Sequence, residues 1–137
     1  MKYFVFFLLT LSFYSCSKKS EIIGKWQLHS IDYSAFYKSI PLDMKENFEK
    51  NMEIQFAALK DKTYFVFNDD LSIQILLPTT ENEVIDGTWS ISEIKDSLHL
   101  RANEPENFKI IKLDEQQLIL KTDESPQRTL FYRKVEN

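Results

Sequence analysis

The 137-residue chain is poor in the residues that usually build metal sites and catalytic loops. It contains one cysteine, two histidines and two glycines. A single cysteine excludes an intramolecular disulfide and a cysteine-based zinc site. Two glycines are too few for a glycine-rich phosphate loop or a Gly-x-Ser-x-Gly nucleophile turn. The turns of this chain must therefore rely on Asn, Asp, Ser and Pro.

Charge and length narrow the class of protein further. Acidic residues outnumber basic ones by 21 to 17, which gives a formal net charge of −4. A mildly acidic, mixed-charge chain lacks the clustered basic footprint that binding to nucleic acid requires. The length fits one domain and leaves little room for a second.

The N-terminus has the pattern of a signal peptide. Lys2 supplies a short positive start, and residues 3–14 form an apolar run interrupted only by Thr10 and Ser12. The run is shorter than the roughly 20 residues of a membrane-spanning helix, and it has the length of a signal-peptide hydrophobic region. The small residue Ser15 then precedes Cys16, and residues 17–21 are polar.

This arrangement resembles a bacterial lipoprotein signal. The resemblance implies that residues 1–15 are cleaved, that the Cys16 thiol is diacylated, and that residues 16–21 form a lipidated tether. Two or three acyl chains give stable membrane attachment. The alternative is an ordinary secretory signal followed by an incidental cysteine. Residues 17–20 lack an acidic run resembling a surface-export signal, so we expect a lipid anchor in the cell envelope, on the periplasm-facing side of the outer membrane.

From residue 22 onward, apolar residues mostly alternate with polar ones, which predicts a series of short antiparallel strands. Residues 41–51 depart from this pattern, because Leu42, Met44 and Phe48 stand at helical spacing. The sequence therefore predicts an all-β, up-and-down barrel of about eight strands with one short helix after the first strand. Closure is favoured because it alone removes both sheet edges. The expected strands lie at 22–31, 52–56, 63–67, 71–77, 85–91, 98–100, 108–113, 118–120 and 129–135.

Both glycines occur in the same motif, Gly-x-Trp, at residues 24–26 and 87–89. On a strand this spacing puts Gly and Trp on one face, where the Gly leaves space for a neighbouring backbone or ring. With a basic segment at 132–134, these motifs resemble lipocalin-like barrels, and in particular the small lipocalin-like domains of Bacteroidota lipoproteins. The resemblance covers the predicted domain, residues 22–137. It implies that Trp26 closes the barrel floor and that Arg133 packs across its ring as a cation–π partner.

Several large aromatic residues fall at inward positions of the predicted strands. An eight-stranded barrel is just wide enough for side chains to fill or to hold one small ligand. Two functions follow. In one, the barrel binds a small hydrophobic ligand; in the other, a filled barrel is a protein-interaction module, such as an envelope complex subunit, an inhibitor or an immunity factor. The candidate core or ligand-lining residues are Trp26, Phe65, Phe67, Trp89 and Tyr132.

The sequence contains no recognisable catalytic or metal-binding pattern. His29 and His99 each fall at an outward strand position, and neither has a second histidine or a carboxylate at ligand spacing. Paired carboxylates such as Asp69 and Asp70 fall at predicted turns. Exposure to water there accounts for charged side chains without a catalytic role. Asp86 is a candidate for an inward carboxylate. We therefore expect no cofactor, no metal and no enzymatic activity.

Overall fold

The computed structural model describes residues 17–79, 81–124 and 126–136. The predicted signal peptide, residues 1–15, and the predicted lipidation site, Cys16, lie outside these residues. The described elements are α2 (Lys18–Ile22), β1 (Gly24–Asp32), α3 (Ser34–Ser39), the 3-10 helix η2 (Leu42–Met44), α4 (Lys45–Leu59), β2 (Tyr64–Phe67), β3 (Ser72–Leu76), β4 (Val84–Ser92), β5 (Ser97–Arg101), β6 (Pro105–Leu113), β7 (Gln117–Thr122) and β8 (Thr129–Val135).

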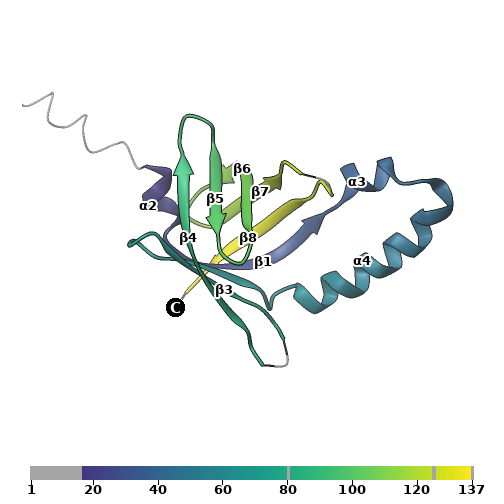
Figure 1. Ribbon diagram of the computed structural model, residues 1–137, viewed down its shortest axis with the longest axis horizontal. Helices are drawn as coiled ribbons and strands as arrows, with labels where there is room; N and C mark the ends of the chain where they lie inside the picture. Colours follow the sequence, from purple (N-terminus) through teal and green to yellow (C-terminus); the bar gives the residue numbers. More distant parts are fainter. Residues whose placement is uncertain (1–16, 80, 125, 137) are drawn as a thin grey trace, which may run out of the picture.

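The eight strands close into a single antiparallel barrel (Figure 1). Each strand pairs with the next along the chain, and β1 closes the ring by pairing with β8, with Lys25 opposite Val135. The prediction of an up-and-down barrel with a helix after the first strand is confirmed. The last strand has the predicted bounds, Thr129–Val135.

Alternation of apolar and polar residues explains why the chain closes in this way. In β7, Leu118 and Leu120 are buried, while Gln117 and Lys121, at the alternate positions, are exposed. The inward residues of all eight strands, together with Ile22 of α2, form one continuous core, because successive strand side chains point to opposite faces. Its members are Ile22, Trp26, Leu28, Phe65, Phe67, Ile73, Trp89, Leu98, Leu100, Phe108, Ile110, Leu118, Leu120, Leu130 and Tyr132.

The strand predicted at 52–56 is wrong, because these residues belong to α4. Met52 and Phe56 fit a strand period, but with Phe48 they also form a one-sided helical row. The structure buries that row in part and leaves Ile54 70% exposed. The helix predicted at 41–51 therefore continues to Leu59 as part of α4, and none of the fifteen residues of α4 is fully buried.

Within the described residues, none of the helices combines the length and the apolar character needed to cross a membrane.

One end of the barrel is packed shut. Helix α2 occupies most of the segment assigned to a tether, and its last residue, Ile22, is fully buried. The Trp26 indole Nε1 donates a hydrogen bond to the Ile22 carbonyl oxygen at 2.7 Å. Phe67 and Trp89 pack edge to face beside it, with ring centroids 5.6 Å apart. Trp26 thus closes this end of the barrel together with α2.

The two glycines make room for different neighbours. A Cβ on Gly87 would collide with the Arg101 carbonyl oxygen and lie 2.9 Å from the Ala102 Cα, so β4 and the end of β5 could not stay this close. Gly24 has a φ of +133°, a conformation that L side chains rarely adopt, and a Cβ there would lie 2.7 Å from the Lys134 Cε. The prediction that glycine leaves space for a neighbouring backbone holds at Gly87.

Candidate functional site

The opposite end of the barrel, where β1 leads into α3, contains a cavity of about 310 Å³. Strands β1, β2, β3, β4, β6 and β8 contribute apolar side chains to its wall, and the last residue of α4 also reaches it. This volume lies near the lower limit of ordinary small-molecule sites, roughly 300–1,000 Å³. The principal apolar lining residues are Leu28, Phe65, Ile75, Ile85, Phe108 and Leu130.

A few polar groups also line this apolar cavity. Thr63 is 6% exposed, and its Oγ1 is buried without a hydrogen-bond partner among the described residues. Burial raises the pKa of the Tyr132 hydroxyl above its ordinary value; Glu106 nearby adds to the rise and Arg128 opposes it. Tyr132 is therefore a neutral hydrogen-bonding group at any physiological pH. Glu106 and Arg128 bring opposite charges to the cavity lining.

The five predicted core or ligand-lining residues are all buried, but they divide between the two ends of the barrel. Phe65 and Tyr132 line the cavity, and their rings stack with centroids 4.8 Å apart. Trp26, Phe67 and Trp89 belong to the packed end and do not line this cavity. The sequence placed all five inside the barrel, but it could not separate the filled end from the open one.

The predicted cation–π pair between Trp26 and Arg133 is wrong. The cation over the Trp26 ring is Lys134, whose Nζ lies 5.1 Å from the ring centroid. Arg133 points outward, where its Nε donates to Gln27 Oε1 at 2.8 Å and its Nη2 lies 3.3 Å from Asp61 Oδ1. Because Tyr132 faces inward, strand alternation places Arg133 outside and returns Lys134 to the side of the indole.

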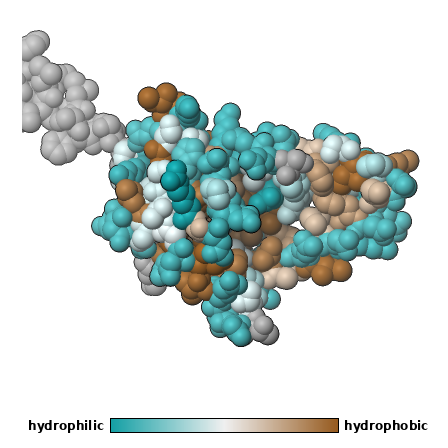
Figure 2. All heavy atoms as spheres, in the orientation of Figure 1, coloured by the Kyte–Doolittle hydropathy of each residue, from teal (hydrophilic) through white to brown (hydrophobic). Residues whose placement is uncertain are grey.

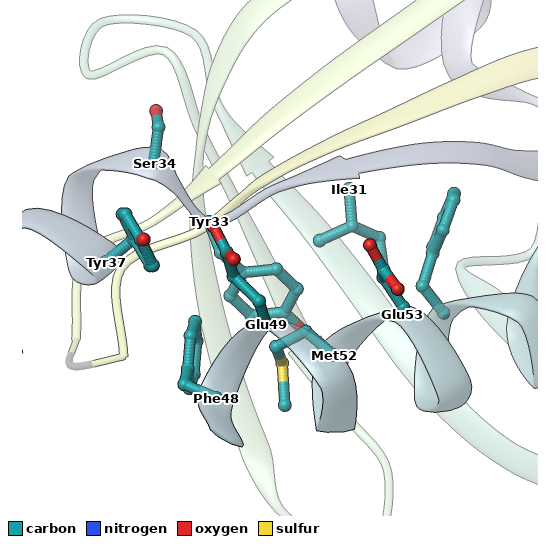
Figure 3. Close-up of a pocket in the computed structure, with 9 residues that line it drawn as sticks. Ile31, Tyr33, Ser34, Tyr37, Phe48, Glu49, Met52 and Glu53 are labelled. Carbon is teal, nitrogen blue, oxygen red and sulfur yellow. The ribbon is translucent and has the colours of Figure 1, made fainter. Parts of the chain in front are cut away.

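A groove between β1, α3 and α4 adjoins the barrel cavity (Figure 3). It encloses about 430 Å³ and shares Ile31 and Tyr33 with the cavity wall. Its centre is Phe48, whose ring centroid lies 5.3 Å from that of Phe36 and 6.3 Å from that of Tyr37. Figure 2 shows apolar residues gathered over α3, with hydrophilic residues along α4.

Sequence reasoning missed this groove. Its rings come from two separate segments, 33–37 and 48–56, and only the tertiary arrangement of α3 and α4 brings them together. The available signal was the row of Phe48, Met52 and Phe56 at four-residue spacing, which continues the helix through the residues assigned to a strand.

The histidines and Asp86 lie on the outer surface of the barrel. His29 Nδ1 is 3.8 Å from Asp61 Oδ1. His99 Nε2 lies 3.2 Å from Ser97 Oγ, and its Nδ1 lies 2.5 Å from Asn107 Oδ1. Strand β5, which carries Ser97 and His99, pairs with β4 on one side and with β6 on the other.

Asp86 is exposed, which makes the inward alternative for this carboxylate wrong, because Ile85, Gly87 and Trp89 take the inward positions of β4. In residues 17–79, 81–124 and 126–136, no group of three or more His, Cys, Asp or Glu side chains is arranged to hold a metal ion.

A closed eight-stranded antiparallel barrel, packed at one end and hollow at the other, defines the class of small up-and-down β-barrels. The chain belongs to the lipocalin-like domain family, whose model matches residues 22–120. No curated protein matches the chain.

Three solved Bacteroides structures are similar in fold. A lipocalin-like protein from Bacteroides uniformis has a TM-score of 0.57 at 14% identity, over 84% of this chain and 99% of that one. An uncharacterized protein from Bacteroides eggerthii has a TM-score of 0.55 at 13% identity, over 82% and 98%. A DUF4847 family protein from Bacteroides vulgatus has a TM-score of 0.53 at 12% identity, over 83% and 94%.

Proposed function

We propose that this protein is a lipid-anchored envelope protein that binds a small hydrophobic ligand at the open end of its barrel. The observation that supports this function best is the cavity of about 310 Å³, with walls formed mainly by apolar side chains of six strands. Burial of apolar ligand surface there contributes roughly 25 cal/mol per Å². The Thr63 and Tyr132 hydroxyls and the two opposite charges supply the few polar groups that orient a ligand in such sites.

The anchor is the second part of the proposal. It rests on the apolar run at 3–14, the small residue Ser15 and the position of Cys16. Helix α2 begins at Lys18 and lies at the packed end of the barrel. Acyl chains on Cys16 would therefore hold the packed end toward the membrane, on the periplasm-facing side of the outer membrane, and leave the cavity facing away from it.

Native mass spectrometry of the protein recovered from its own host's envelope, without organic extraction, tests the ligand. A discrete added mass that disappears on denaturation supports the proposal and identifies the ligand class. A bare protein mass, together with no enhancement of an environment-sensitive hydrophobic dye, contradicts it. Leu130→Trp is the matching variant, because its larger side chain fills the cavity and should abolish the added mass; Leu118→Met in the core is the control.

One observation favours the second function, a protein-interaction module. Helix α4 buries none of its residues fully, and Leu42, Met44 and Ile54 are 86%, 58% and 70% exposed on or beside it. Large exposed apolar side chains on one segment support an interaction role, because large apolar patches mark protein-interaction sites. Cross-linking in the envelope with a photoreactive residue at position 54 tests this function, and a specific adduct lost in Leu42→Asp would favour it.

A further inference from the structure

The barrel cavity and the α3–α4 groove adjoin, and together they offer a ligand two different environments. Ile31 and Tyr33 line both, so the two sites are immediate neighbours. The cavity is lined by aliphatic and aromatic carbon, which suits an apolar chain. Within it, the unpartnered Thr63 hydroxyl, on a side chain that is 6% exposed, also points to a ligand in this region.

The groove differs from the cavity in its aromatic rings and its charge. Tyr33, Tyr37, Phe48 and Phe56 supply four rings to its lining. Aromatic faces attract organic cations, most effectively where several rings surround the charge. One ring of this cluster already contacts a cation of the chain itself, because Lys45 Nζ lies 4.8 Å from the Tyr37 centroid. Lys45 does not line the groove.

The charged residues that line the groove are both acidic. Glu49 and Glu53 lie one turn apart on α4, and Figure 3 shows both side chains rising from the helix toward β1. Like charges at this spacing repel each other. No ion pair among the described residues involves either carboxylate, whereas Glu46 on the same helix pairs with Lys50 at 3.4 Å. A cation between Glu49 and Glu53 would relieve their repulsion.

The charges around the groove do not remove its preference for a cation. In the barrel cavity, Glu106 and Arg128 have opposite charges, so the residues that line the two sites carry a net charge of −2. Lys45, one turn before Glu49 on α4, is a neighbouring cation that does not line the groove. Lys60 Nζ lies 6.0 Å from the Phe56 centroid, at the far end of α4, and it does not line the groove. An anionic head group would therefore meet two carboxylates and no lining cation in the groove.

We propose that the site binds a cationic amphiphile, with its apolar chain in the barrel cavity and its ammonium group among Tyr33, Tyr37, Glu49 and Glu53. This inference rests on the proposed ligand-binding function and names the chemical class of the ligand. A single-headed organic ammonium with a chain of moderate length matches this pair of sites, because the groove and the cavity share Ile31 and Tyr33.

Isothermal titration calorimetry on the chain from Ser17 onward, which contains every strand of the barrel and both helices of the groove, tests this inference. The probes are octyltrimethylammonium, octyl sulfate and octyl glucoside, each below its micelle concentration, with tetramethylammonium as the probe without a chain. We expect octyltrimethylammonium to bind about tenfold more tightly than the other two octyl probes, and tetramethylammonium to bind weakly. The preference should shrink in high salt.

The variant E49Q/E53Q should lower affinity for octyltrimethylammonium about tenfold and leave octyl glucoside unchanged. The matched control is E46Q, which removes a carboxylate from the same helix outside the groove and should change neither affinity. Because all three positions are exposed, these variants are expected to keep the fold.

The remaining outcomes separate the two proposals. Equal binding of the three octyl probes, or an unchanged ammonium affinity in E49Q/E53Q, overturns the cationic class and leaves the hydrophobic site standing. Failure of all three octyl probes to bind counts against the ligand-binding function itself. A concentration-dependent dimer in sedimentation that excludes the probes would assign the groove to a second copy of the chain and overturn the inference.

Discussion

Replacing Thr63 with valine should stabilise the protein, although it removes a polar group from the barrel. Thr63 Oγ1 is buried and has no hydrogen-bond partner among the described residues. A buried hydroxyl without a partner costs roughly 1–3 kcal/mol in protein mutational data. Valine replaces that hydroxyl with a methyl group of similar shape. The backbone stays fixed, because Thr63 N donates to the Leu59 carbonyl and its own carbonyl accepts from Leu28 N.

We expect the free energy of unfolding of Thr63→Val to rise by about 1–2 kcal/mol, with a Tm increase of roughly 3–5 °C for each kcal/mol at this chain length. The assay is urea denaturation followed by circular dichroism, with the slope of the transition compared between variants, because an unchanged slope identifies a change in stability alone.

The other buried threonine provides the matched control. Thr122 is 7% exposed, like Thr63 at 6%, but its Oγ1 accepts a hydrogen bond from Arg128 N at 3.0 Å. Thr122→Val should therefore lower the free energy of unfolding by about 1–2 kcal/mol. If Thr63→Val also destabilises the protein, the Thr63 hydroxyl is satisfied in solution, and the reasoning from its missing partner is refuted.

Three further predictions concern pH, packing and localisation. Folding should weaken as the pH rises above 10, the ordinary pKa of tyrosine, because burial raises the pKa of Tyr132 and only the unfolded state ionises freely there; Tyr132→Phe should flatten this slope in alkaline urea titrations, and an unaltered slope would contradict the assignment. Gly87→Ala should cost about 1–3 kcal/mol in the same denaturation assay, since its Cβ would collide with the Arg101 carbonyl oxygen; wild-type stability would show that β4 and β5 separate easily. Cys16→Ala should move the protein from the membrane fraction to the soluble fraction, and unchanged fractionation would rule out the acyl anchor.

The barrel could be predicted from the sequence because alternation is a local signal. Residues such as Leu118 and Leu120 fix the face of their strand without reference to any other part of the chain. The same signal misleads at 52–56, where Met52 and Phe56 satisfy both a strand period and a helical one. Only the continuation of the row from Phe48 distinguishes the two, and the structure shows that the helical period wins.

The candidate site was predictable only in part, because its geometry depends on long-range contacts. Strand alternation places Phe65 and Tyr132 inside the barrel, but it does not say how far along the barrel axis each one lies. The position of Trp26 at the packed end depends on α2, whose Ile22 accepts the indole hydrogen bond. Lys134, and not Arg133, lies over Trp26 because neighbouring residues of a strand point to opposite faces. A family resemblance does not resolve a shift of one residue.

The pairing of β1 with β8 sets the order in which this chain can fold. Contacts between Lys25 and Val135 join residues from nearly opposite ends of the domain, so the entropy of closing a very long loop must be overcome before the barrel is complete. Hairpins such as β6–β7 can form early, but they leave sheet edges unpaired until β8 arrives. A nascent chain of this topology stays open until its last strand has been synthesised. That delay would keep the chain unfolded during the membrane export that the proposed signal peptide predicts.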